Sequence, residues 1–162
     1  EGFTINIVGV LGNESRINAF EKMSNVDSLA VDNFDSLLFT LLEARYGSNI
    51  NFINKCETLE YMVKINGKNI LMVHGNELKH NRLEDEVVKL KHRWYKKTGI
   101  MADYVLLGHI HSHCITPSYS RSGSLVGANC YSDNGLNIST SVASQNLYII
   151  EKEIEAIPIV LQ

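Results

Sequence analysis

The amino-terminal part of the chain has two segments in which apolar residues recur at a regular spacing. From Phe3 to Val10 they alternate with smaller residues, which predicts a buried strand that runs into the loop Leu11-Gly12-Asn13. Four leucines then fall at helical spacing: Leu37, Leu38, Leu41 and Leu42. Asp32 or Asn33 can cap this predicted helix, and Gly47 can end it.

The middle of the chain predicts a hairpin. Ile50–Ile53 is a short strand candidate, and Leu59–Ile65 alternates apolar and polar residues. Asn66-Gly67 supplies the two positive-φ positions of a tight turn before the apolar run Ile70–Val73. We therefore expect two antiparallel strands joined at this turn.

An amphipathic helix and another apolar strand follow. Leu83–Lys97 predicts a helix that ends near Gly99. Its apolar face carries Val87, Leu90 and Trp94, and its opposite face carries Lys89, His92, Arg93 and Lys96. Tyr104–Leu107 is uniformly apolar, which is typical of a buried strand.

The carboxy-terminal part reads as β-rich. We expect strands at Ser124–Ala128, Asn146–Ile150 and Ile154–Val160, with Asp133-Asn134-Gly135 as a turn. The serine-rich stretch Ser118–Ser124 predicts a mobile loop. Because strands and helices are interleaved, the pattern favours an α/β protein with a mixed β-sheet flanked by helices.

Length, composition and charge are those of an ordinary globular domain. The 162 residues suit a single domain, 1–162, and 44% hydrophobic against 20% charged residues is typical of a soluble globular protein. With 15 Lys plus Arg against 18 Asp plus Glu, no global basic field attracts nucleic acid or an anionic membrane. No apolar run approaches the roughly 18 residues that span a bilayer. We expect a cytoplasmic protein without a membrane partner.

The cysteines and the first residue add two expectations. Cys56, Cys114 and Cys130 are an odd number without CxxC spacing, which predicts reduced thiols rather than disulfides or a structural zinc site. The first residue is not Met, and a strand pattern begins almost at once. This is expected of a chain that begins inside a domain, and a tag-cleaved full-length protein is the alternative that composition leaves open.

Three apolar strands each finish in a short polar loop that contains glycine. The loops are Gly12-Asn13-Glu14-Ser15-Arg16, Val73-His74-Gly75 and Gly108-His109-Ile110-His111. Open α/β sheets place ligand sites at such strand ends, so the loops are expected to converge. Imidazole nitrogens and an amide oxygen are suitable ligands for Zn, Mn or Fe. Three His and one Asn carry no negative charge, so a pair of divalent ions needs carboxylates from elsewhere.

The order Gly-Asn, His-Gly and Gly-His-x-His resembles the last three motifs of the calcineurin-like metallophosphoesterases. The resemblance implies that Asn13, His74 and His109 bind one ion and that His111 binds its neighbour. It implies a two-metal centre of Mn, Fe or Zn that hydrolyses a phosphoester. It covers nearly all of the chain but only the later half of the family's domain. The resemblance therefore predicts the carboxy-terminal part of a metallophosphoesterase sandwich, incomplete at its N-terminus.

This chain departs from the family's pattern at two points. The Asp-x-His and Gly-Asp elements with which the family begins occur nowhere in it. Glu14 stands where the family usually has a histidine, and Arg16 can add a charge-assisted contact to a phosphate oxygen. These two residues are the catalytic candidates. The stretch from Arg121 to Gly127 is similar to phage-encoded relatives, which favours a nucleotide or nucleic-acid substrate.

Other functions stay open on the same residues. One is a non-catalytic module that keeps the fold and binds protein or nucleic acid. The basic stretch Lys89–Lys97 could contact a nucleic-acid backbone, although a solvated helix face with Trp94 in the core is the favoured interpretation. Another is a single-metal protein that uses His74, His109 and Asn13. An unpaired sheet edge would favour a homo-oligomer. His80 and His92 are assigned no role, and His113 is interpreted as a polar loop residue.

Overall fold

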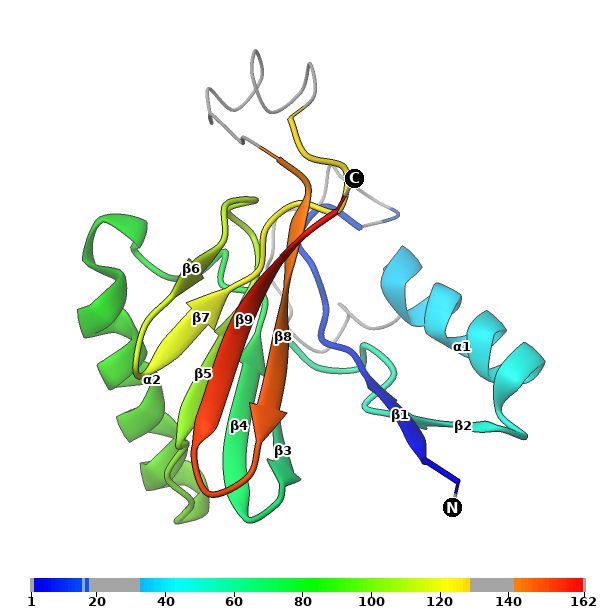
Figure 1. Ribbon diagram of the computed structural model, residues 1–162, viewed down its shortest axis with the longest axis horizontal. Coiled ribbons are helices and arrows are strands. Elements are labelled where there is room, and N and C mark those ends of the chain that lie inside the picture. Colours follow the sequence, from blue (N-terminus) through cyan, green and yellow to red (C-terminus); the bar gives the residue numbers. More distant parts are fainter. Residues whose placement is uncertain (1, 16, 18–32, 129–141, 162) are drawn as a thin grey trace. The chain divides into compact units, whose positions relative to one another are not determined.

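A computed structural model describes residues 2–15, 17, 33–128 and 142–161 (Figure 1). The chain forms two compact units, residues 1–61 and residues 62–162, and each is described by itself. Four features of the sequence lie outside the described residues: Arg16, Asp32, the predicted turn Asp133-Asn134-Gly135, and Cys130.

Unit 1 is a strand, a helix and a strand. Strand β1 (Ile5–Val8) pairs in parallel with β2 (Ile50–Ile53). Helix α1 (Phe34–Tyr46) lies between them in the sequence. It begins at Asn33, whose side chain accepts a hydrogen bond from the backbone N–H of Asp35 at 2.8 Å. Both strands and the helix were predicted, and the asparagine cap satisfies an N–H that the helix itself leaves unpaired.

The core of unit 1 does not use the leucines of α1. It contains the buried residues Leu11 and Cys56, with Phe39 and Leu59 packed against them. Among the helix leucines, Leu37, Leu38 and Leu41 are 49%, 53% and 60% exposed. Helical spacing therefore predicted the helix correctly, whereas burial follows Phe39 instead.

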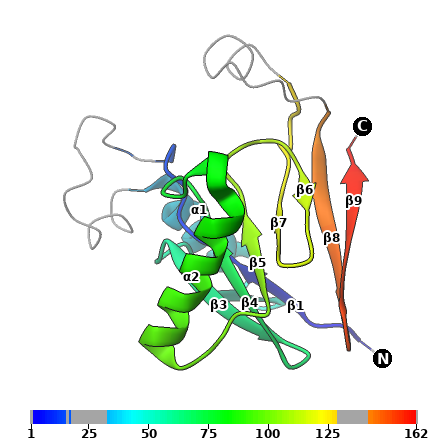
Figure 2. The same cartoon turned by 90° about the vertical axis from the view of Figure 1, so that its left-hand side faces the viewer.

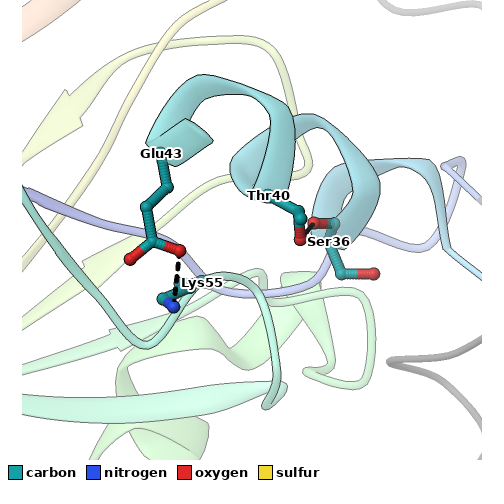
Figure 3. Close-up of polar contacts among 4 residues, drawn as sticks. All are labelled: Ser36, Thr40, Glu43 and Lys55. Carbon is teal, nitrogen blue, oxygen red and sulfur yellow. Dashed lines mark hydrogen bonds and ion pairs between the residues drawn. The ribbon is translucent and has the colours of Figure 1, made fainter. Parts of the chain in front are cut away.

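Polar contacts on α1 are drawn in Figure 3. Lys55 Nζ lies 2.6 Å from Glu43 Oε2, and Thr40 Oγ1 donates to the Ser36 carbonyl at 2.9 Å. The hydrogen bond to Glu43 raises the pKa of Lys55. Since both charged side chains are more than a third exposed, water screens the pair and it adds little to stability.

Unit 2 is built on a five-stranded mixed sheet of order β3-β4-β5-β7-β6. Its strands are β3 (Glu60–Ile65), which crosses the boundary between the units, β4 (Lys68–Val73), β5 (Tyr104–Leu107), β6 (Cys114–Ile115) and β7 (Tyr119–Arg121). Strands β4, β5 and β7 are parallel, and β6 is antiparallel to β7. The predicted α/β class with a mixed sheet is thus confirmed, and self-association through the edge strands β3 or β6 stays a prediction.

Local chemistry explains the predicted elements of this sheet. Asn66 and Gly67 have φ of 47° and 83°, as the turn between β3 and β4 requires. Helix α2 (Leu83–Thr98) follows a short 3-10 turn, η2 (His80–Arg82), and ends at Gly99 with φ of 74°. Its apolar face covers one face of the sheet through a core of Leu71, Val73, Leu83, Val87, Leu90, Ala102, Val105, Leu107 and Tyr119.

A long hairpin covers the other face of the sheet. Strands β8 (Ser144–Ile150) and β9 (Ile154–Val160) pair antiparallel, as their predicted positions imply. The Tyr148 hydroxyl lies 2.5 Å from Ser120 Oγ, and its ring contacts that of Tyr104. Figure 2 shows the resulting layers of unit 2, with α2 on one side of the sheet and β8 and β9 on the other.

Two predictions about the carboxy-terminal part were wrong. Ser124–Ala128 forms no strand, because Gly127 takes a φ of 68° and Leu125 is 69% exposed. Ser118–Ser124 is not simply a loop, because it contains β7 in the interior of the sheet order. Ser120 is fully buried there, and its contact with Tyr148 satisfies its hydroxyl. In the described part of the chain, no helix is long and apolar enough to cross a membrane.

Candidate metal centre

Three parallel strands of unit 2 end side by side at one edge of the sheet. Val73 of β4 is in register with Leu107 of β5, and Leu107 is in register with Arg121 of β7. His74 and Gly108 are therefore the first residues beyond the ends of two adjacent strands. Polar side chains gather at such carboxyl ends in open α/β sheets.

The loops after β4 and β5 bring two of the predicted ligands together. The rings of His74 and His109 meet edge to face, with centroids 5.1 Å apart. Between them, the Gly108 N–H donates to the His74 carbonyl at 3.0 Å. A Cβ atom at Gly108 would lie 3.6 Å from His74 Nδ1, which is ordinary van der Waals contact, so the imidazole packs beside the Gly108 backbone.

The histidine turn, residues 108–112, has an uncommon backbone. His109 and His111 have φ of 69° and 51°, in the left-handed region that non-glycine residues seldom occupy. The Ile110 N–H donates to the Gly108 carbonyl at 2.9 Å and tightens the turn. His111 is half-buried, and the ring contacts of the described histidines join His74, His80 and His109 without it. Such backbone conformations persist when neighbouring contacts hold them, and they often occur at functional sites.

His80 joins this cluster although the sequence assigned it no role. Its ring stacks on that of His109 with centroids 5.3 Å apart and an interplanar angle of 28°. Partial burial, followed by the positive charge of Arg121, lowers the pKa of His80 and favours the neutral imidazole. The signal available in the sequence was its position in the same loop after β4 as His74.

Arg121 is the second residue that the sequence did not single out for this site. Its Nε donates to the Ser112 carbonyl at 2.7 Å, and its Nη2 donates to Ser112 Oγ at 2.9 Å. The guanidinium therefore lies against the histidine turn and brings a permanent positive charge to the cluster.

The remaining candidates lie in unit 1 or beyond the described residues. Asn13 is half-buried, and its Nδ2 donates to Glu14 Oε1 at 2.7 Å. This contact uses the nitrogen of the amide, whereas a metal would bind its oxygen. Glu14 is exposed, and Arg16 lies outside the described residues. Their roles as ligand and catalytic groups stay predictions.

The donor set tests whether a metal fits. Two neighbouring imidazoles suit Zn, Mn or Fe, and strand ends hold them firmly. Within residues 2–15, 17, 33–128 and 142–161, however, no three His, Cys, Asp or Glu side chains are grouped to hold an ion. Unit 2 therefore offers part of the ligand shell of one ion. It does not offer the negative charge that a pair of divalent ions needs.

Comparison with known proteins gives no family assignment, since no family model and no curated protein matches the chain. Solved structures resemble it at low identity. The chain is 12% identical to wild-type Vps29 from Entamoeba histolytica complexed with zinc, over 97% of both chains with a TM-score of 0.48. A conserved uncharacterised protein from Streptococcus pneumoniae, described as a predicted phosphoesterase, is 13% identical over 83% of this chain and 85% of that one, with a TM-score of 0.44.

A Vps29 double mutant from Entamoeba histolytica aligns over a shorter span. It is 13% identical over 65% of this chain, with a TM-score of 0.43, and the alignment spans 62% of its own length. Identities and TM-scores of this size do not assign the chain to a family, and a shared fold does not fix an activity.

Proposed function

We propose that unit 2 binds one divalent transition-metal ion between His74 and His109, and that the protein uses this ion to hydrolyse a phosphoester. The observation that carries the proposal is the convergence of these two imidazoles at strand ends that are in register. The motif order of the sequence supports the phosphoester class. The similarity of the segment after β7 to phage-encoded relatives favours a nucleotide or nucleic-acid phosphodiester within that class.

The residues of unit 2 have separate parts in this proposal. A bound metal supplies Lewis-acid chemistry, polarising a phosphoryl oxygen and lowering the pKa of a water molecule. His74 and His109 would hold it as neutral nitrogen ligands, with His111 as a further candidate. Arg121 brings a positive charge beside the histidine turn, which suits an anionic phosphate. Carboxylates that complete a catalytic centre would come from outside this cluster.

A second candidate function is a non-catalytic metal-binding or partner-binding module. Among the described residues, no three His, Cys, Asp or Glu side chains are grouped to hold an ion, which favours this candidate. Without further ligands, the site lacks the negative charge for a second ion. A retained single ion would then organise the loops for a protein or nucleic-acid partner.

Metal stoichiometry and hydrolysis separate these functions. Purified protein is incubated with manganese or zinc, dialysed, and measured by elemental analysis. The same samples are assayed for hydrolysis of bis(p-nitrophenyl) phosphate. We expect His74→Ala and His109→Ala to lose the metal, and His92→Ala, a histidine on the exposed surface of α2, to retain it.

Each outcome has a distinct meaning. Metal with turnover, both lost in His74→Ala, supports the phosphoesterase. Metal without turnover supports the non-catalytic module. No metal in the wild-type protein refutes the phosphoesterase and the metal-binding module, and leaves only a partner-binding module that works without metal.

A further inference from the structure

A four-residue segment runs along the histidine turn and forms several hydrogen bonds with it. This clasp, Arg121–Ser124, begins at the last residue of β7. The Ser122 N–H donates to the Leu107 carbonyl at 3.0 Å, just before the turn. The Ser124 N–H donates to the His111 carbonyl at 3.1 Å, inside it. The clasp therefore continues the strand pairing beyond the sheet and fixes both ends of the turn.

The side chain of Arg121 makes the remaining connection. It bonds Ser112 twice, through Nε to the carbonyl and through Nη2 to the hydroxyl, at 2.7 and 2.9 Å. Two donors of one rigid planar group fix both the position and the orientation of their acceptors. A lysine ammonium is a single point on a flexible stem and cannot reproduce this fork.

The first residues of β8 form hydrogen bonds with the clasp. Three successive β8 residues donate to three carbonyls of the clasp: Asn146 to Arg121 at 3.0 Å, Gln145 to Gly123 at 3.0 Å, and Ser144 to Ser124 at 2.9 Å. The backbones approach so closely that a Cβ at Gly123 would lie 2.9 Å from the Ser144 carbonyl oxygen. Arg121 is thus anchored at its backbone by one element while its side chain holds another.

The turn requires such support. His109 and His111 both occupy the left-handed region, which costs of order 1 kcal/mol or more for each non-glycine residue. Without outside bonds, the backbone would relax and move the His109 ring away from His74.

We propose that Arg121 is a positioning residue: its two hydrogen bonds to Ser112 hold the histidine turn in the conformation that keeps His109 beside His74. The consequence for metal affinity rests on the proposed function, whereas the effect on the turn does not. Residues that orient metal ligands in this way change metal affinity by about 10- to 100-fold when they are replaced.

The first test measures the turn without metal. Amide hydrogen exchange is followed by NMR in the wild-type protein, in Arg121→Gln and in Arg121→Lys. We expect the Ile110 and Ser124 amides to exchange about tenfold faster or more in both variants, because a charge-assisted bond is lost. The Asp103 amide, which bonds Asn69 at the other end of the strands, should not change. Unchanged exchange at Ile110 and Ser124 would overturn the proposal.

The second test measures cobalt affinity by absorption titration of the same proteins. We expect Arg121→Gln to weaken binding about tenfold or more, and Arg93→Gln, on the exposed face of α2, to bind as the wild type does. If Arg121→Gln does not fold, Ser112→Ala removes one of the two bonds and should speed exchange at Ile110 by a smaller factor; no change there would equally overturn the proposal. A wild-type protein that binds no cobalt but shows the exchange effect would refute the proposed function and leave Arg121 as the support of the turn.

Discussion

The side chain of Asn33 joins two parts of unit 1, and its replacement gives a sharp prediction. It is 1% exposed, accepts from the Asp35 N–H at 2.8 Å and donates to the Gly12 carbonyl at 3.2 Å. The first bond caps helix α1. The second holds the loop that carries Asn13. Asn33→Ala removes both bonds in a site that water does not readily enter.

The expected loss of stability follows from these two bonds. Replacing an N-cap asparagine by alanine costs about 1 kcal/mol. Leaving the Gly12 carbonyl of this part-buried contact without its partner costs about 1–3 kcal/mol. The free energy of unfolding of unit 1 should therefore fall by about 2–4 kcal/mol, which is a large share of the stability of a small unit.

Thiol labelling of Cys56 provides the assay, because this residue is 3% exposed and belongs to the core of unit 1. In a background with Cys114→Ser and Cys130→Ser, labelling reports the opening of this unit. A loss of 2 kcal/mol corresponds to about 30-fold faster labelling, since about 1.4 kcal/mol is a factor of ten. Urea unfolding followed by far-UV circular dichroism should show a matching loss.

Asn33→Ser serves as the matched control. Serine also caps helices well, so its loss should be limited to the contact with Gly12, about 1–3 kcal/mol. Labelling of Asn33→Ala within threefold of the wild-type rate would refute the reasoning. Equal rates for the serine and alanine variants would show that the cap contributes nothing.

Three further predictions concern single groups. Burial, and then the charge of Asp35, raises the pKa of Cys56 from 9.0 to about 12, so the folded state holds this proton more tightly. The stabilisation of the folded state by the protonated thiol is complete below pH 9 and is lost as the pH rises towards 12. The free energy of unfolding of Cys56→Ala, measured with urea, should therefore depend less on pH in this range than that of the wild-type protein. Gly67→Ala places a side chain at a φ of 83° in open space and should cost about 1–2 kcal/mol in urea unfolding, from backbone strain alone. Lys55→Met removes the ion pair of Figure 3, and its small effect on thermal stability should disappear in 1 M salt, whereas a persistent loss would point to packing by the lysine stem.

Elements with strong local signals were predictable from the sequence. The Asn66-Gly67 turn has the required left-handed backbone, and Gly99 ends α2 in the same region. The apolar run Tyr104–Leu107 forms β5 at the predicted residues. In each case neighbouring residues alone determine the local conformation, so pattern and propensity were sufficient.

Elements that depend on distant partners were not predictable. The sequence of β7 has the polar character of a loop, because the hydroxyl of Ser120 finds its partner in Tyr148, a residue of the distant strand β8. Leu125 and Val126 read as a strand, yet they are exposed beside a left-handed Gly127. Short strands take their stability from pairing and burial, which a single sequence does not display.

The candidate site divides in the same way. His74 and His109 could be identified because each lies within two residues of the end of an apolar strand, and adjacent parallel strands end together. His80 and Arg121 reach the cluster through a 3-10 turn and through a strand that the pattern did not reveal. Their contacts with His109 and Ser112 exist only once the sheet order is known.

The most direct test of the central claim is an anomalous difference map from crystals grown with zinc and measured at the zinc absorption edge. We predict a peak at about 2.0–2.1 Å from a ring nitrogen of His74 and from one of His109. A map without a peak at these residues, from protein that binds zinc elsewhere or not at all, would contradict it.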